Sequence, residues 1–211
     1  MAKAKKGKEA ALDLTTEEKI KNAALKVFTK KGFAAARTRD ISEEAGINLA
    51  LLNYYFRSKE KLFELVMTET LRGFIKGMLE ILNDTETSIE EKVEIFVTRY
   101  SELLMQQPDL PLFIFHELKM NPEQLASKLG GEGLFKSYFI KQVKEAMDNG
   151  KLPRMHPLHF IMNMVGLTVF PFIGAPLLRH LSGVDAKTFN GLVEERKTLI
   201  PKWIKMMMKG K

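Results

Sequence analysis

The chain has 211 residues, with 33 Lys and Arg against 26 Asp and Glu and no cysteine. This length suits one small domain and one of middle size, and the missing cysteine excludes disulfides, thiolate metal sites and cysteine nucleophiles. The charge is uneven, because residues 1–66 carry a net charge of +5 and residues 67–211 a net charge of +2. A basic region is typical of nucleic-acid binding, although a membrane surface or an acidic partner would also suit it.

The first residues have a positive start but no apolar core, so they do not read as a secretory signal. Residues 1–14 are expected to form a disordered basic tail, and the cytoplasm is the expected compartment. Thr15 and Glu18 then form a capping box, the signature of a helix start. Apolar residues recur at helical spacing from Ile20 to Phe28, which predicts an amphipathic helix that ends at Gly32.

Residues 37–61 predict two short helices joined by a tight turn. The first covers about residues 39–45, with Thr38 as its N-cap. Gly46 can turn left-handed without a Cβ clash, and Asn48 can cap the second helix, about residues 49–55. Ser58 can cap a further helix. In each helix, two apolar residues four positions apart are expected to face inward: Ile41 with Ala45, and Leu52 with Phe56.

The second short helix leaves polar and aromatic side chains on its outer face, including Asn53, Tyr54 and Tyr55. Such a face suits the DNA major groove, where an amide can pair with adenine, an apolar group can meet a thymine methyl and a hydroxyl can reach phosphate. We expect phosphate contacts from Thr38, Tyr55 and Lys59. The side chains expected to face bases or groove walls are Arg39, Leu49, Ala50, Asn53 and Tyr54.

One run of residues resembles the DNA-binding domain of the TetR (tetracycline repressor) family of bacterial transcription regulators, over roughly residues 16–66. The residues that carry the resemblance are Thr38-Arg39-Asp40-Ile41, Ala45-Gly46-Ile47-Asn48, Leu52, Tyr54-Tyr55-Phe56-Arg57-Ser58-Lys59-Glu60 and Leu62-Phe63. Asn53 stands where the family usually has tyrosine, and Leu51 where it often has a small or polar residue. Both positions face DNA in the family, so relatives do not predict the operator sequence.

The remaining chain predicts helices throughout and shows no sustained strand alternation. The expected fold is all-α, with about nine helices. Residues 15–66 would form a three-helix helix-turn-helix domain, and residues 67–211 a helical ligand-binding and dimerisation domain. A long helix from Ser58 past Leu82 is expected to connect the two, because no linker rich in Gly or Pro separates them.

Residues 157–181 are almost continuously apolar, and a last helix of about residues 185–208 is apolar on one face, with Pro201 expected to kink or break it. A membrane span is one interpretation of residues 157–181, but Pro171 and Pro176 interrupt a run that is barely long enough. A buried helix is the other. We expect the two helices of one copy to pack against those of a second copy in a four-helix bundle, as the resemblance also implies.

The middle of the chain is rich in aromatic residues and methionine. Each such residue by itself suits a plain core, but together they could line an apolar cavity with a few polar groups. The resemblance implies a pocket between the middle helices and the apolar helix. The candidates are Phe96, Tyr100, Phe113, His116, Phe139, Asn163, Met164 and Thr168.

His156 and His159 could lie on one helix face, but no third ligand stands at metal-binding spacing. No phosphate loop or nucleophile elbow is present. We therefore expect no metal, no cofactor and no enzyme activity.

The predicted function is that of a homodimeric transcription regulator, more specifically a repressor. It would bind a palindromic operator in the bacterial nucleoid and leave it when a small apolar or amphipathic ligand binds. A membrane-associated helical protein that uses residues 157–181 is the alternative.

Overall fold

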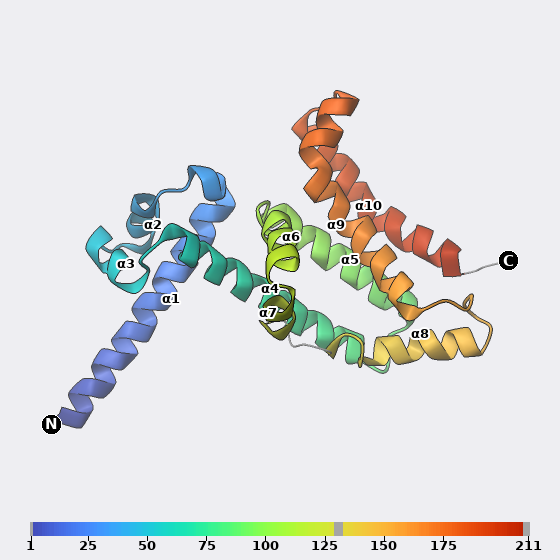
Figure 1. Ribbon diagram of the computed structural model, residues 1–211, viewed down its shortest axis with the longest axis horizontal. Coiled ribbons are helices and arrows are strands. Elements are labelled where there is room, and N and C mark those ends of the chain that lie inside the picture. Colours follow the sequence, from blue (N-terminus) through green and yellow to red (C-terminus); the bar gives the residue numbers. More distant parts are fainter. Residues whose placement is uncertain (1, 129–132, 209–211) are drawn as a thin grey trace. The chain divides into compact units, whose positions relative to one another are not determined.

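The computed structural model describes residues 2–128 and 133–208, and the side chains of residues 16–127 and 133–208. This part of the chain consists of ten helices without a strand, which confirms the all-α prediction (Figure 1). The helices are α1 (Ala2–Ala35), α2 (Thr38–Ala45), α3 (Leu49–Tyr55), α4 (Lys59–Asn83), α5 (Ile89–Gln106), α6 (Leu110–Met120), α7 (Pro122–Lys128), α8 (Tyr138–Asp148), α9 (Pro157–Ser182) and α10 (Ala186–Met208).

The chain divides into two compact units, Met1–Thr70 and Leu71–Lys211. Helix α4 contributes its first turns to the first unit and its remainder to the second. Helix α1 already includes residues 2–14, where a disordered tail was predicted, and it runs through Thr15, where a helix start was predicted. The side chains of residues 1–15 lie outside the described set.

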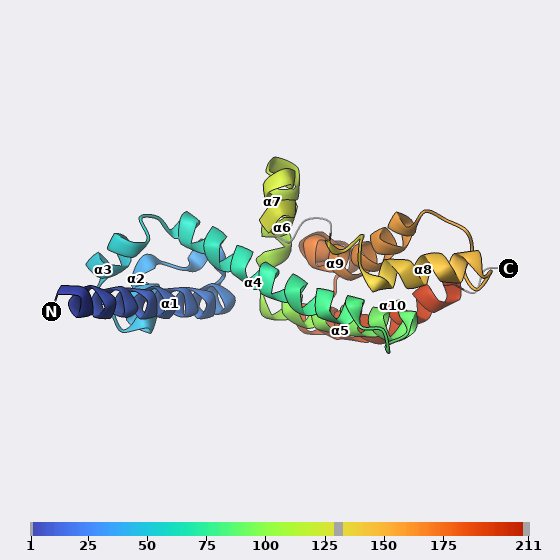
Figure 2. The same cartoon turned by 90° about the horizontal axis from the view of Figure 1, so that it is seen from below.

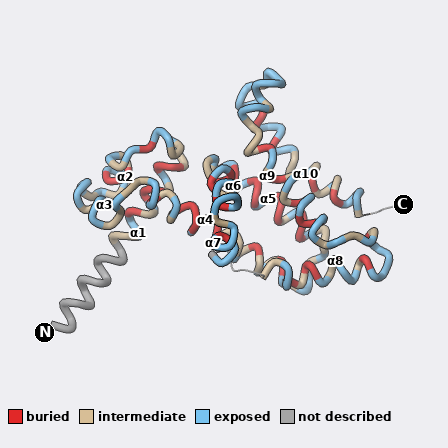
Figure 3. Tube along the Cα trace, in the orientation of Figure 1, coloured by how far each residue is buried: buried red, intermediate tan, exposed pale blue. Residues whose placement is uncertain are grey.

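The first unit is a three-helix core closed by the start of α4. Its buried apolar side chains come from all four helices (Figure 3): Ile20, Ala24, Val27 and Phe28 of α1, Ile41 of α2, Leu52 of α3, and Leu62 and Val66 of α4. Gly32 has φ 75° and ψ 162°, so the regular helix stops there as predicted. A side chain at that position would be strained, because L residues rarely adopt this φ.

The second unit packs α5 against α9, α10 and α8. Fully buried residues of this core include Val97, Leu104, Phe139 and Val143. Helices α6 and α7 project from this packed group (Figure 2). Helix α10 continues through Pro201, so the break expected at that proline is absent.

Lys92 of α5 closes one corner of the second unit. Its fully buried ammonium group donates to the carbonyls of Asp84 at 2.6 Å and Thr87 at 2.9 Å, and to Gln142 Oε1 at 2.8 Å. All three N–H donors of the ammonium are therefore used. Burial lowers the pKa of Lys92, while Asp84 and Glu91 raise it to a smaller extent. This lysine fastens α8 to the turn between α4 and α5.

Candidate nucleic-acid interface

Helix α2 begins one residue earlier than expected, so the prediction of Thr38 as N-cap is wrong. Arg37 holds the N-cap position with extended backbone, and its N–H donates to Asp40 Oδ2 at 3.0 Å. The Lys31 ammonium reaches Asp40 Oδ1 at 2.9 Å. The hydrogen bond from Lys31, followed by the one from the Arg37 backbone, lowers the pKa of Asp40. Asp40 therefore ties the entry of α2 to α1.

The turn between α2 and α3 has the predicted geometry. Gly46 is left-handed, with φ 66° and ψ 32°, and its N–H donates to the Glu43 carbonyl at 3.1 Å. Asn48 caps α3 by accepting the Leu51 N–H at 2.7 Å. These two local features set the direction in which α3 leaves the turn.

Helix α3 has one anchored face and one open face. Leu52 is 1% exposed, and Phe56 just beyond the helix is half-buried. On the open face, Tyr54 is 75% exposed and Leu49 is 41% exposed. Ala50 and Asn53 are also exposed, while Tyr55 is half-buried with its ring edge-on to Tyr54 at a centroid distance of 5.4 Å.

A simple observation singles out this helix. Among the described side chains of the first unit, the large apolar or aromatic ones left exposed are Leu49 and Tyr54, and both belong to α3. The helix is only seven residues long. The major groove is wide enough for one helix.

Lys59 lies in a different environment from the one expected. Its ammonium donates to the carbonyls of Phe33 at 3.0 Å and Ala36 at 3.1 Å, and it lies 4.3 Å from the centroid of the Phe33 ring. Phe33 in turn contacts Phe63 at a centroid distance of 4.6 Å. Lys59 thus fastens the segment between α1 and α2 to the start of α4, where Ser58 Oγ accepts the Lys61 N–H at 3.1 Å.

Exposed arginines lie in α2 or next to α2 and α3 along the chain. Arg39 is exposed and pairs loosely with Glu43, at 3.4 Å between Nε and Oε1. Thr38 is half-buried at the start of α2. Arg37 and Arg57 are also exposed near the ends of α2 and α3, and sequence reasoning did not select either of them. In the sequence, the only feature that could have indicated these two arginines was their position next to a predicted helix end.

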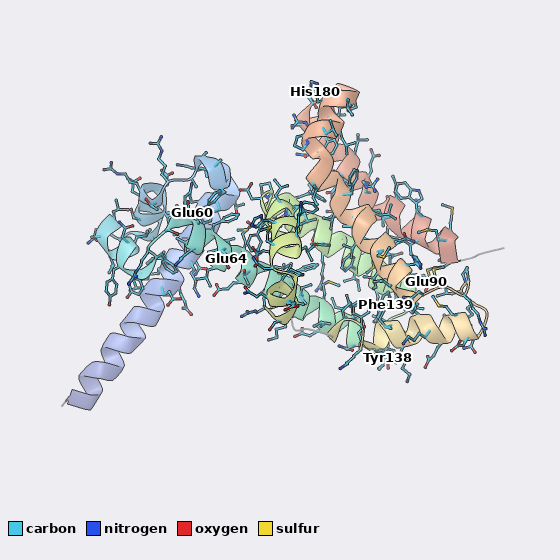
Figure 4. The ribbon with its side chains drawn as sticks, viewed as in Figure 1. Glu60, Glu64, Glu90, Tyr138, Phe139 and His180 are labelled. Atoms are coloured by element: carbon cyan, nitrogen blue, oxygen red, sulfur yellow. The ribbon has the colours of Figure 1, made fainter. Side chains whose placement is uncertain are left out.

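The predicted ligand-pocket residues lie in different environments. Buried ones are Phe96, Tyr100, Phe113, Phe139, Met164 and Thr168, whereas His116 and Asn163 are exposed. The Tyr100 ring stacks on Phe74 at 4.8 Å, and Phe139, labelled at the start of α8 in Figure 4, meets Phe160 at 5.7 Å. Asn163 lines a methionine-rich cavity of about 230 Å³. The remaining pocket assignments stay predictions.

Comparisons with known proteins bear on the same region. A family model described as bacterial regulatory proteins, tetR family, matches residues 20–66. The chain is 26% identical over 167 residues to the probable HTH-type transcriptional regulator YttP of Bacillus subtilis, which covers 77% of this chain and 79% of the relative. It is 38% identical over 81 residues to the HTH-type transcriptional repressor NicS of Pseudomonas putida, over 37% of this chain and 38% of the relative.

The fold also has a solved counterpart. The transcriptional regulator FadR from Bacillus subtilis, in complex with stearoyl-CoA, superposes with a TM-score of 0.52 at 17% identity, over 87% of this chain and 96% of that one. The family match over residues 20–66 includes α2, the Gly46 turn and α3, whose outer face is open. Residues 20–66 therefore match the DNA-binding domain of the TetR family of bacterial regulators, and most of the chain is similar to a probable helix-turn-helix transcriptional regulator.

Proposed function

We propose that this protein is a homodimeric repressor that reads a palindromic operator with α3 and leaves it when a small apolar or amphipathic molecule binds the second unit. The observation that carries the DNA contact is the open face of α3, where Tyr54 and Leu49 remain exposed although their neighbour Leu52 is sealed in the core. The repressor named NicS supports the sign of regulation. The protein would act in the bacterial cytoplasm, at the nucleoid when bound.

The exposed side chains suggest a division of roles. Asn53 would pair with adenine, and Leu49 and Ala50 would meet thymine methyl groups. Tyr54 faces the groove wall together with Arg39. Thr38 and Tyr55, at the ends of the motif, position the domain on phosphates.

Lys59 would act on DNA binding indirectly, by holding the segment that leads into α2. Because its ammonium already donates to two backbone carbonyls, its effect on DNA binding would come from holding the entry of α2. This positioning role replaces the direct phosphate contact predicted from the sequence.

Dimerisation would use α9 and α10. Helix α9 exposes large apolar side chains at helical spacing: Met162 (53% exposed), Phe170 (61%), Leu177 (62%) and Leu181 (73%). Helix α10 exposes Leu192 (46%). Large apolar side chains that recur in this way on one exposed helix face are typical of an interface. A two-fold axis would allow the same surface to cover itself.

The membrane alternative uses the same helix. By length and composition, α9 could cross a bilayer, and 22% of its most apolar window is buried. Yet α9 packs along α5 and α10 within the second unit and also meets α6 and α8. A helix that supplies Phe160, Ile161 and Met164 to a folded core is better explained by a partner copy over its open side. Partition of the pure protein into detergent would favour the membrane instead.

Release by a ligand would act through the distance between recognition helices. In helix-turn-helix dimers, these helices lie about one DNA turn apart, roughly 34–36 Å, or a multiple of it. A ligand that binds better to a dimer with another spacing shifts the population away from DNA. The stearoyl-CoA bound to FadR supports an acyl or other apolar compound as the effector.

Selection of bound DNA from a random pool tests the proposal. The expected result is a palindrome whose half-sites are one helical turn or a multiple apart. Light scattering on the same sample should give the mass of two copies. Failure to enrich any sequence at low salt, or enrichment of a single unpaired half-site by a monomer, would contradict it.

A further inference from the structure

The second unit contains a cavity of about 230 Å³ whose lining includes Asn163 but none of the other predicted pocket residues. It lies among the end of α8, the α8–α9 connection, the first turns of α9 and the last turns of α10. Methionines make up half of its lining, with three other apolar side chains and one amide: Met147, Leu152, Met155, Phe160, Asn163, Ile204, Met207 and Met208.

The cavity has a sealed floor and an adaptable mouth. Leu152, Phe160 and Ile204 are buried. Met207 is 42% exposed, and Asn163 is exposed, with its Nδ2 atom 3.8 Å from Met207 Sδ. Methionine side chains adjust to irregular ligands, and a lone amide at the mouth can orient one polar group. This arrangement suits an apolar chain that enters with its polar end last.

A second depression of about 390 Å³ shares Met147 and Met155 with the first. Lys144 and Arg154 line it on the solvent side, together with Asp148. Its formal charge is therefore positive. An anionic group would be attracted to the two cations, while a cationic group would be repelled. The two depressions together combine an apolar cavity with a basic rim.

We propose that these two depressions form one binding site for a medium-chain carboxylate or another amphipathic anion of that size. A methylene group is close in size to a water molecule, whose share of liquid volume is about 30 Å³, so the cavity holds roughly eight carbons. The apolar tail fills the methionine cavity, and the anionic head lies against Arg154 and Lys144. That this binding releases DNA rests on the proposed function; the binding itself does not.

Calorimetry on the full chain tests the site with octanoate, octanol and octyltrimethylammonium as probes. We expect octanoate to bind at least tenfold more tightly than octanol, and the cation to bind more weakly than octanol. Equal affinities for the three probes, or no heat of binding with octanoate at millimolar concentration, would overturn the proposal.

Two pairs of variants locate the site. Arg154→Gln should weaken octanoate about tenfold and change octanol less than twofold, whereas Arg179→Gln, an exposed arginine near the other end of α9, should change neither. Met207→Trp should fill the mouth and abolish octanoate binding, whereas Met206→Trp, its exposed neighbour outside the lining, should not. Circular dichroism and light scattering confirm that each variant is folded. Wild-type octanoate affinity in folded Met207→Trp would refute the site.

Fluorescence anisotropy with operator DNA separates this inference from the proposed function. Octanoate that binds and lowers operator affinity supports both. Octanoate that binds in calorimetry without any change in operator affinity supports the site and contradicts its role in release.

Discussion

The two units treat their apolar side chains differently. In the first unit, the described large apolar or aromatic side chains left in solvent are confined to α3, whereas the second unit exposes such residues on α6, α9 and α10. The exposure of Leu49 and Tyr54 in a small domain that buries its other large apolar side chains supports the proposal that α3 enters a DNA groove. The larger exposed apolar surface of the second unit supports the proposal that a second copy covers it.

The largest effect is expected from a substitution that introduces a charge on the exposed side of α9. Phe170→Asp should give a monomer, because a carboxylate would be buried without a partner at the proposed interface. Losing the second half-site should lower operator affinity by roughly 10²–10⁴-fold. Leu118→Asp on α6, similarly exposed at 56%, is the control and should remain dimeric. Light scattering and anisotropy decide the outcome, and an intact Phe170→Asp dimer would remove α9 from the interface.

The next largest effect should come from Lys59→Met. The change removes hydrogen bonds from a charged group to two carbonyls, worth about 1.5–3 kcal/mol in unfolding free energy. Binding to operator and to random DNA should weaken together, with the salt dependence unchanged. Lys61→Met, an exposed lysine two residues away, controls for the lost charge. Urea unfolding and anisotropy at several salt concentrations are the measurements.

A direct phosphate contact by Lys59 would give the opposite pattern. Stability would be kept, and the slope of log affinity against log salt would fall by about one unit. That pair of results would restore the role predicted from the sequence.

Asn53→Ala tests base reading on α3. If the amide pairs with adenine, preference at one base position should fall by about 1–3 kcal/mol, with little change on random DNA. Asn190→Ala on α10, also exposed, should leave both affinities unchanged. Equal losses on operator and random DNA would show that Asn53 does not read bases.

Tyr100 offers a smaller test, in the core of the second unit. Burial raises the pKa of Tyr100 to about 12. The neutral Tyr100 phenol therefore makes its full contribution to the free energy of unfolding below pH 10, the ordinary pKa of tyrosine. This contribution is lost as the pH rises from 10 through 12. At pH 11 the wild type should have lost about 1.4 kcal/mol of unfolding free energy from this group. Tyr100→Phe should lack this part of the alkaline loss in urea unfolding at pH 8, 10 and 11. Identical alkaline losses in the two proteins would contradict the burial of a neutral phenol.

Local interactions explain which predictions succeeded. The cap of α3 by Asn48 and the turn at Gly46 each involve residues within a few positions of each other. Backbone geometry and short side chains settle such contacts before any tertiary packing. At Thr38 the prediction was one residue late, because the N–H of Arg37 donates to Asp40, and Asp40 also pairs with Lys31.

Longer-range contacts explain the rest. The sequence did not predict the two carbonyls that Lys59 binds, because they are 23 and 26 residues away. It also did not predict that the Tyr100 ring stacks on Phe74 from α4, and the pocket role of Tyr100 stays a prediction. The cavity around Met147 and Met207 could not be predicted, because its walls come from elements that meet only when α8, α9 and α10 pack together.

Apolar spacing along the sequence predicted an all-α fold of about nine helices and the short helix after Gly46, and the resemblance to the TetR family predicted the class of regulator. These depend on interactions along a few turns of chain, for which spacing is sufficient information. Packing between helices distant in the sequence decided that Lys59 binds backbone carbonyls, which aromatic rings are buried in the core and where the second unit has a cavity. These features depend on residues that become neighbours only in the folded chain, and the spacing of residues in the sequence does not identify those neighbours.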